Sequence, residues 1–331
     1  MAKAQICKSY MYNNTFKGLP TFSDFKLIEE KLPPLNDNEY LAEALYVRVA
    51  PRFDSTTSLI QPNTVPKATQ LAKIIESKNK KFAVGQYIIG EFGWRTHTIV
   101  SKDMQGDSYL APKIEQLSLS LLLGYLGLPG IAGYFGFLKV CEPDDNNVVV
   151  ISSAAGAIGS YVGQIAKIKR CKVIGITSTE EKCLWLVNKL GFDHYINYKT
   201  DNIKQKLQEY APDGVDCYFD NVGGEISSSV IYHMKMKGRI CVCGGTALYY
   251  NENTKADEVQ SPIKVKVAKM EGIHADRWKK HWPDAIQQNL QWLQENKLKN
   301  NETVLNKFEN IPQSYINTLS GKFNGNVVIK V

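Results

Sequence analysis

The sequence lacks the residue clusters that mark most metal centres and disulfide frameworks. Its seven cysteines include no C-x-x-C pair, and their number is odd. None of the five histidines lies in a Gly-His-Glu context. These absences argue against a zinc site and a disulfide framework. We therefore expect reduced thiols, no bound metal and a cytoplasmic protein. The N-terminus is polar and carries Lys3 and Lys8, a pattern that is not typical of a secretory leader.

Long runs of one charge are also absent. The net charge of +7 is spread along 331 residues, so it does not indicate nucleic acid binding. It would help to attract an anionic cofactor or substrate. One stretch, residues 117–138, is nearly free of charge and long enough to suggest a membrane helix. Glycines at 124, 127, 130, 133 and 136 and a proline at 129 interrupt it. We expect a buried helical connector there, and neither a nucleic acid nor a membrane as a partner.

The arrangement of expected elements changes along the chain. Residues up to about 116 are rich in strand patterns, such as the alternation over 41–49. From Val148 strands and helices alternate, with strands expected at 148–152, 171–177, 194–198, 215–222 and 239–243 and helices after Ile158, over 199–210 and from Trp282. Repeated strand–helix units predict a doubly wound parallel sheet of α/β class. A final strand at 326–331 resembles the start of the chain. We therefore expect a β-rich domain over 1–120 and 299–331, interrupted by a nucleotide-binding domain over 121–298.

The strongest local signal is a tight turn after the first of these strands. Small residues and glycines follow Val148–Ser152, and an apolar helical pattern begins at Ile158. This strand–turn–helix arrangement directs a helix N-terminus at a pyrophosphate. Ala154 takes the place of the first glycine of the usual G-x-G-x-x-G motif. Residues Gly156 to Gly159 are the expected phosphate-binding segment.

An acid is missing where an NAD site would have one. The second strand of the unit ends in Thr177-Ser178-Thr179, whereas an Asp or Glu there would bind the ribose hydroxyls of NAD. Glu180 and Glu181 begin a helix behind the Thr cap, and Lys182 follows. Hydroxyls beside a cation suit a 2′-phosphate, so the sequence favours NADPH over NADH.

Longer segments resemble one known family. They are residues 154–167, 189–192, 197–200 and 216–225, the last of which contains Asp-Asn-Val-Gly-Gly. They are similar to the zinc-independent medium-chain dehydrogenases/reductases of the prostaglandin reductase 1, leukotriene 12-hydroxydehydrogenase and plant alkenal reductase branch. The similarity runs from Gly18 to the C-terminus. It implies a Rossmann sheet inserted in a GroES-like domain, and a homodimer.

The resemblance also implies site residues and a reaction. The pyrophosphate would lie on Gly156, Ala157, Ile158 and Gly159, and the 2′-phosphate near Lys182 and Tyr198. The nicotinamide half would lie against residues at the ends of later strands: Asn221, Cys243, Gly244, Gly245, Thr246, Ala247, Leu248, Tyr249, Ile273, His274, Ala275 and Asn324. The implied reaction is NADPH-dependent reduction of the C=C bond of an α,β-unsaturated aldehyde or ketone, of the 15-oxo-prostaglandin or alkenal type.

The active-site tyrosine of the family matches two positions. An alignment without a gap from Gly244 selects Tyr249, whereas the Tyr-Asn dipeptide selects Tyr250, so both stay candidates. The chain departs from the family pattern at Ala50, Arg52, Asp54, Ala132 and Phe323. These departures motivate one alternative, a catalytically silent cofactor-binding paralogue. A second alternative, an NADPH quinone oxidoreductase, stays open because it shares the fold and the cofactor.

Overall fold

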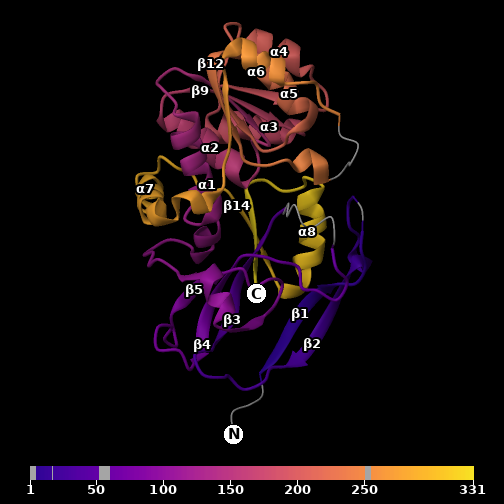
Figure 1. Cartoon of the computed structure of the whole chain (residues 1–331), viewed down its shortest axis with the longest axis vertical. Helices are drawn as coiled ribbons and strands as arrows, with labels where there is room; N and C mark the ends of the chain where they lie inside the picture. Colours follow the sequence, from indigo (N-terminus) through magenta and orange to yellow (C-terminus); the bar gives the residue numbers. More distant parts are fainter. Residues whose placement is uncertain (1–4, 17, 52–59, 250–254) are drawn as a thin grey trace. The chain divides into compact units, whose positions relative to one another are not determined.

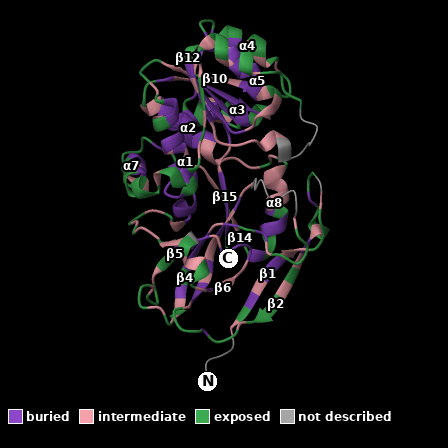
Figure 2. Ribbon diagram, viewed as in Figure 1, coloured by how far each residue is buried: buried purple, intermediate pink, exposed green. Residues whose placement is uncertain are grey.

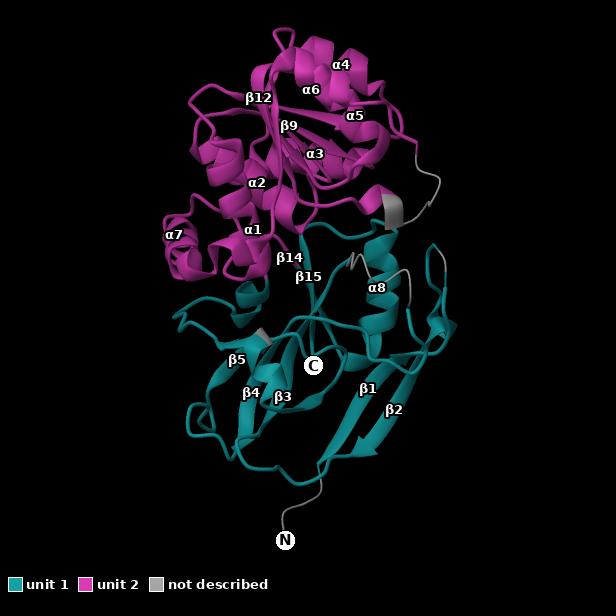
Figure 3. Ribbon diagram, viewed as in Figure 1, with its two compact units in different colours: residues 1–123, 303–331 teal, residues 124–302 magenta. Residues whose placement is uncertain are grey.

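The computed structural model describes residues 5–16, 18–51, 60–249 and 255–331. The chain forms two compact units, one of residues 1–123 and 303–331 (unit 1) and one of residues 124–302 (unit 2) (Figure 3). The domain limits expected at about 120 and 298 stay predictions, because compactness does not show that a segment folds by itself.

Unit 1 is built mainly of antiparallel strands, and its largest sheet has seven of them (Figure 1). The order is β14-β15-β3-β4-β5-β7, and β6 pairs with β3. A separate two-stranded sheet joins β1 and β2. The bounds are β1 Ile6–Tyr12, β2 Phe25–Lys31, β3 Tyr40–Val49, β4 Gln70–Ser77, β5 Tyr87–Gly90, β6 His97–Val100, β7 Ser108–Leu110, β14 Glu302–Asn306 and β15 Asn326–Lys330. One α-helix, α8 (Ile311–Leu319), follows β14, and 3-10 turns lie at Phe22–Asp24, Asp103–Asp107 and Phe308–Asn310.

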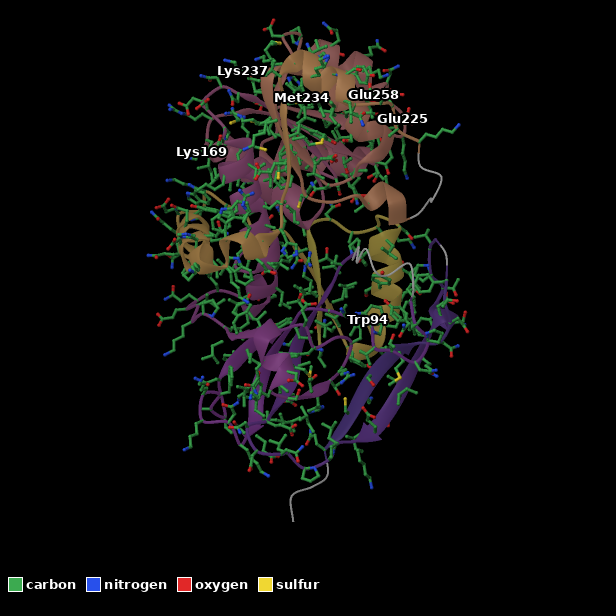
Figure 4. All side chains as sticks on the ribbon, viewed as in Figure 1. Trp94, Lys169, Glu225, Met234, Lys237 and Glu258 are labelled. Atoms are coloured by element: carbon green, nitrogen blue, oxygen red, sulfur yellow. The ribbon has the colours of Figure 1, made fainter. Side chains whose placement is uncertain are left out.

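Aromatic side chains form much of the core of unit 1. Trp94, labelled in Figure 4, is 3% exposed. Its ring meets Tyr10 edge-on at 6.5 Å between centroids and Phe25 at 5.1 Å. Such pairs add stability beyond the area that they bury. The core therefore joins β1 and β2 to the larger sheet through these rings.

Unit 2 contains a six-stranded parallel sheet in the order β10-β9-β8-β11-β12-β13. Its strands are β8 Val148–Ser152, β9 Lys172–Thr177, β10 His194–Asn197, β11 Val215–Asp220, β12 Met234–Val242 and β13 Lys269–Gly272. The chain adds β9 and β10 on one side of β8, then returns and adds β11 to β13 on the other side. The topological switch point therefore lies between β8 and β11, where open sheets of this kind bind ligands at the carboxyl ends of the strands.

Helices cover both faces of this sheet, and its strands are largely buried (Figure 2). Alternate strand residues, including Val150, Ile174 and Ile240, pack with residues of α4, α5 and α6. Gly175, which neighbours Ile174, faces Leu186 of α3 instead. The helices are α1 Leu128–Phe135, α2 Ala157–Ile168, α3 Glu180–Leu190, α4 Ile203–Tyr210, α5 Gly224–Tyr232, α6 Gln260–Lys266 and α7 Trp282–Gln294. The predicted α/β class, a doubly wound parallel sheet with a β-rich remainder, is confirmed.

Of two local predictions, one is confirmed and the other is wrong at one end. The segment 117–138 is a broken helical connector, as expected: a 3-10 turn at Leu119–Leu123, then α1, then a π-helix at Gly136–Cys141. The helix expected over 199–210 begins only at Ile203, so that prediction was wrong at its start. Asn197 ends β10 in a turn, where its carbonyl accepts from the N–H groups of Thr200 and Asp201. The side chain of Asn202 then caps the helix by accepting from the N–H of Gln205 at 3.1 Å.

Candidate functional site

The turn between β8 and α2 has the geometry of a phosphate-binding loop. Ser153 has φ of 49°, in the left-handed region, and turns the chain at the end of β8. Gly156 is the N-cap of α2, and no side chain caps the helix there. The first-turn N–H groups and the positive end of the helix dipole are therefore suited to an anion. Gly156, Ala157, Ile158 and Gly159, the residues predicted to bind the pyrophosphate, all lie in this turn or the first turn of α2.

Gly159 allows α2 to approach the turn. A Cβ at this position would lie 2.4 Å from the carbonyl oxygen of Ser153 and 2.8 Å from Cα of Ala154. Both neighbours are backbone atoms, which cannot move aside without moving the strand end. Ala154 itself is fully buried, so a methyl group is accommodated where the usual motif has its first glycine.

The switch point is closed by hydrogen bonds between β8 and β11. Asn221, directly after β11, donates from its backbone N–H to Oγ of Ser152 at 2.9 Å and from Nδ2 to the carbonyl of Ser152 at 2.8 Å. The hydroxyl of Ser152 in turn donates to Oδ1 of Asp220 at 3.0 Å. Asn221 is 9% exposed. These contacts fix its side chain at the edge where a cofactor would cross from one half of the sheet to the other.

The segment after β12 is tied to the same edge. The N–H groups of Cys243 and Gly244 donate to the carbonyl of Asp220 at 2.7 and 3.1 Å, and the N–H of Ala247 donates to Val222 at 2.9 Å. A Cβ on Gly244 would lie 2.9 Å from the carbonyl oxygen of Asn221, so only glycine fits without a shift. The structure thus brings Cys243, Gly244, Gly245, Thr246 and Ala247 to the residues around Asn221.

The residues after β13 lie beside this segment. The N–H of Ile273 donates to the carbonyl of Val242 at 2.9 Å, which places Ile273 next to the end of β12. Ala275 is 9% exposed. The His274 side chain is 83% exposed and lies 3.5 Å from a carboxylate oxygen of Asp276. Of the three predicted residues, Ile273 is the one with a backbone link to the carboxyl edge.

A second group of candidates lies at the ends of β9 and β10. The Oγ of Thr179 caps α3 by accepting from the N–H of Lys182 at 3.3 Å. Lys182 is 9% exposed, and burial lowers the pKa of its ammonium, with Lys199 lowering it further and Glu181 opposing. The N–H of Tyr198 donates to the carbonyl of Thr177 at 3.0 Å, so Tyr198 lies beside the end of β9. A buried lysine beside a capped helix start fits a phosphate dianion, which would compensate the desolvation of its charge.

The remaining candidates lie in other parts of the fold or outside the described residues. Asn324 lies in unit 1, where its carbonyl accepts from Oγ1 of Thr303 at 3.0 Å. Phe323 packs against the unit 1 core, and Ala132 against a cluster with Ile131 and Phe135. The side chains of Leu248 and Tyr249 lie outside the described residues, as do Tyr250, Arg52 and Asp54. The backbone of Tyr249 ends a 3-10 helix, η6 (Thr246–Tyr249).

Asp220 and Ser152 are not among the site residues predicted from the sequence. The carboxylate of Asp220 is 2% exposed and accepts from hydroxyl and backbone N–H donors around it, including Oγ of Ser152. Asp220 is an acidic residue at the end of an apolar strand. This position could have indicated a site residue in the sequence, because a buried carboxylate needs hydrogen-bond partners. The serine that ends β8 carried no such signal.

The described part of the chain shows neither a metal-binding cluster nor a membrane-spanning helix. There, no group of three or more His, Cys, Asp or Glu side chains could hold a metal ion. No described helix combines the length and apolar content that a membrane crossing requires.

The seven cysteines are free thiols, six of them buried and Cys243 half-buried. Burial raises the pKa of the Cys243 thiol to about 12, so this thiol stays protonated at neutral pH.

Two family models match the chain, and they divide it. Residues 8–106 match the N-terminal domain of oxidoreductases, and residues 157–293 match the zinc-binding dehydrogenase model. The first match falls in unit 1 and the second in unit 2. The second match includes the first turn of α2, Lys182, Asn221 and the segment after β12.

Relatives match over the full length. Prostaglandin reductase 1 of Bos taurus is 41% identical over 327 residues, with 98% of each chain covered. The NADP⁺-dependent 2-alkenal reductase of Nicotiana tabacum is 30% identical, with 100% of this chain and 99% of the relative covered. Among solved structures, CurA from Vibrio vulnificus in complex with NADPH matches with a TM-score of 0.89 and 28% identity, covering 98% of this chain and 99% of CurA. The chain therefore belongs to the medium-chain dehydrogenase/reductase family of oxidoreductases, in the group that contains prostaglandin reductase 1.

Proposed function

We propose that this chain catalyses the NADPH-dependent reduction of the C=C bond of α,β-unsaturated aldehydes and ketones, of the alkenal or 15-oxo-prostaglandin type. The observation that carries the proposal is the carboxyl edge of the unit 2 sheet. The uncapped start of α2, the fixed Asn221 and the segment after β12 meet there. The relatives named for prostaglandin and alkenal reduction, which the chain matches over its whole length, support the same reaction.

The preference for NADPH follows from the adenosine end of this edge. The end of β9 offers Thr177, a hydroxyl residue, in place of the acid of NAD sites. Lys182 supplies a buried cation. We assign Lys182 and Tyr198 to the 2′-phosphate and residues 156–159 to the pyrophosphate. The nicotinamide half is assigned to Asn221, residues 243–249, residues 273–275 and Asn324.

When bound, NADPH supplies the hydride that reduces the β-carbon of the substrate. Negative charge then grows on the carbonyl oxygen, and we assign the hydrogen-bond donor to that oxygen to the phenol O–H of Tyr249 or Tyr250. The α-carbon takes a proton from solvent. The protein residues supply orientation and electrostatics, as is general for nicotinamide enzymes.

A substrate panel tests the reaction. Loss of NADPH is followed with an alkenal, a 15-oxo lipid, a saturated aldehyde and a quinone, and the products are identified by mass. We expect turnover with the two enones, a saturated carbonyl product and no turnover with the saturated aldehyde. Turnover with the quinone alone would favour the quinone oxidoreductase alternative. Binding of NADPH without turnover of any substrate would favour the silent paralogue.

The resemblance also carries the proposal of a homodimer. Sedimentation velocity of the purified chain tests it, with about twice the 37.2 kDa chain mass expected. A monomer at micromolar concentration would contradict it.

A further inference from the structure

The carboxylate of Asp220 is the most heavily hydrogen-bonded group at the switch point. Its Oδ1 accepts from Oγ of Ser152 at 3.0 Å, from Oη of Tyr218 at 2.9 Å and from the N–H groups of Val222 and Gly223 at 3.0 Å each. Its Oδ2 accepts from Oγ of Ser227 at 2.6 Å. Asp220 is 2% exposed. All of these donors are neutral, so hydrogen bonds alone hold the buried carboxylate.

The network that starts at Asp220 spans three strands. The backbone carbonyl of Asp220 receives the N–H groups of Cys243 and Gly244, which fixes the start of the segment after β12. Its Oδ1 holds the Ser152 hydroxyl, and that hydroxyl accepts from the N–H of Asn221 at 2.9 Å. The ends of β8, β11 and β12 are therefore set relative to one another through one side chain and its own backbone.

We propose that Asp220 is a positioning residue for hydride transfer. Its carboxylate fixes Asn221 through the Ser152 hydroxyl and holds the N–H of Val222, whose carbonyl receives the N–H of Ala247. Together with the Asp220 backbone carbonyl, it keeps Asn221 and the segment from Cys243 to Ala247 in the one arrangement that holds the nicotinamide half of the cofactor. The proposal rests on the proposed function, which places the nicotinamide against these residues. Asp220 itself, buried below the edge, acts through its neighbours.

The energetic reason is the sensitivity of group transfer to geometry. A misplacement of about 1 Å can reduce a rate by roughly a hundredfold. Four donors converge on the single atom Oδ1, so a change in the charge or position of that atom moves several parts of the edge together. The residues assigned to the 2′-phosphate lie elsewhere: Lys182 is in the first turn of α3, Tyr198 directly follows β10, and neither is among the five donors to the Asp220 carboxylate described above. A positioning role therefore predicts a loss confined to the nicotinamide half.

Helix α5 offers a matched pair of variants. Ser227→Ala removes the donor to Oδ2 and leaves Asp220 in place. Ser228→Ala removes the neighbouring hydroxyl, which is 1% exposed, donates toward the carbonyls of Gly224 and Glu225 and accepts from the N–H of Asp257 at 3.4 Å. Ser228→Ala therefore controls for the loss of a buried hydroxyl in the same helix. Asp220→Asn keeps an oxygen acceptor, removes the charge and is the stronger change.

The experiment compares two ligands by calorimetry. NADPH probes the whole site, and adenosine 2′,5′-bisphosphate probes the adenosine half. For Asp220→Asn we expect the NADPH dissociation constant to rise about tenfold or more, and for Ser227→Ala severalfold, while the value for the bisphosphate changes less than about twofold. Ser228→Ala is expected to leave both unchanged. Parallel losses for the two ligands, or no loss for NADPH, would overturn the positioning role.

Single-turnover rates give a second readout. With an alkenal that the wild-type protein reduces, Asp220→Asn should slow hydride transfer by about a hundredfold, with a larger isotope effect from 4-deuterated NADPH. If Asp220→Asn does not fold, Ser227→Ala still tests the positioning role, because it removes only the hydroxyl donor to Oδ2. The binding comparison needs no turnover, so a wild-type protein that reduces no enone would refute the proposed function and leave the positioning test intact.

Discussion

In the proposed adenosine site, Lys182 is a residue whose burial disfavours its positive charge. Its side chain is 9% exposed, and burial is the main cause of its lowered pKa. The nearby Lys199 adds to the shift, because two ammonium groups disfavour each other's charge. A phosphate dianion at this corner would relieve both effects. The specificity for NADPH is therefore best tested at Lys182.

Replacing Lys182 by Gln should separate the two cofactors. Loss of a charged hydrogen-bond partner is worth about 1.5–3 kcal/mol, so we expect the NADPH dissociation constant to rise roughly 10- to 100-fold. The value for NADH should stay within about twofold, because NADH has no 2′-phosphate. Lys189→Gln is the control, since Lys189 is exposed near the other end of the same helix. Equal losses for NADPH and NADH would contradict the assignment.

The pH dependence of binding follows from the same shift. A lysine with a lowered pKa loses its proton at a lower pH than an ordinary lysine. A bound phosphate favours the protonated form, so NADPH binding above this pKa must take up a proton. We expect the NADPH affinity to fall as the pH rises from neutral into the alkaline range, and the NADH affinity to fall less. Calorimetry in buffers of different ionisation enthalpy measures the proton uptake; an identical pH profile for the two cofactors would count against it.

The two tyrosine candidates are also distinguished at the level of single residues. Removing an oxyanion donor reduces turnover by about 10²- to 10³-fold. We therefore expect one of Tyr249→Phe and Tyr250→Phe to reduce kcat for an alkenal by this amount, and the other to leave it nearly unchanged. NADPH binding serves as the control for correct folding. If neither substitution lowers the rate of enone reduction, the proposed donor is wrong.

Glycine allows helix α2 to pack closely against the turn after β8 and against Phe192, which follows α3. A Cβ on Gly163 would lie 1.9 Å from the ring of Phe192, and one on Gly159 would meet the backbone of the turn. Alanine favours a helix by about 1 kcal/mol over glycine. Overpacking of about 1–3 kcal/mol opposes that gain. At Gly163 the contact is far below van der Waals distance, so the clash decides the sign.

Gly163→Ala should therefore lower the free energy of unfolding by up to about 2 kcal/mol, which is the overpacking loss less the helix gain. Phe192→Leu should also destabilise, because Phe192 is 2% exposed. The double variant should be more stable than the sum of the two losses predicts, since the smaller side chain makes room for the methyl group. Denaturant unfolding of all four proteins measures this coupling. Strict additivity would show that the ring does not limit the position.

The elements of unit 2 were largely predictable, and the contacts between them were not. Strand and helix periodicity located the sheet, and the missing acid after Thr177 pointed to the corner where Lys182 is buried. Periodicity alone did not place the start of α4 at Ile203, because it does not include the capping preference of Asn202, whose side chain fixes that start. The five donors around Asp220 come from β8, β11, the following turn and α5, so their convergence depends on the tertiary fold.

At the scale of the whole molecule, the assigned cofactor residues are unequally divided between the two units. All of them except Asn324 belong to unit 2, which is one continuous segment, residues 124–302. Asn324 belongs to unit 1, just before β15. The assigned residues therefore belong to segments that are far apart in the sequence. Hydrogen exchange measured by mass spectrometry resolves such segments.

NADPH should therefore slow exchange in peptides that cover residues 153–160, 179–183, 221–224 and 243–249 of unit 2. If Asn324 contacts the nicotinamide half, a peptide from unit 1 that covers residues 320–326 should be protected as well. A ligand at a hundredfold excess over its dissociation constant stabilises the bound state by about 2.7 kcal/mol, so protection in directly contacted segments is expected to approach 100-fold. NADH at the same concentration is the control, and it should protect residues 179–183 less, because the contact of Lys182 depends on the 2′-phosphate. Protection confined to unit 2 would remove Asn324 from the site, whereas unprotected 153–160 would remove the glycine turn and with it the basis of the cofactor assignment.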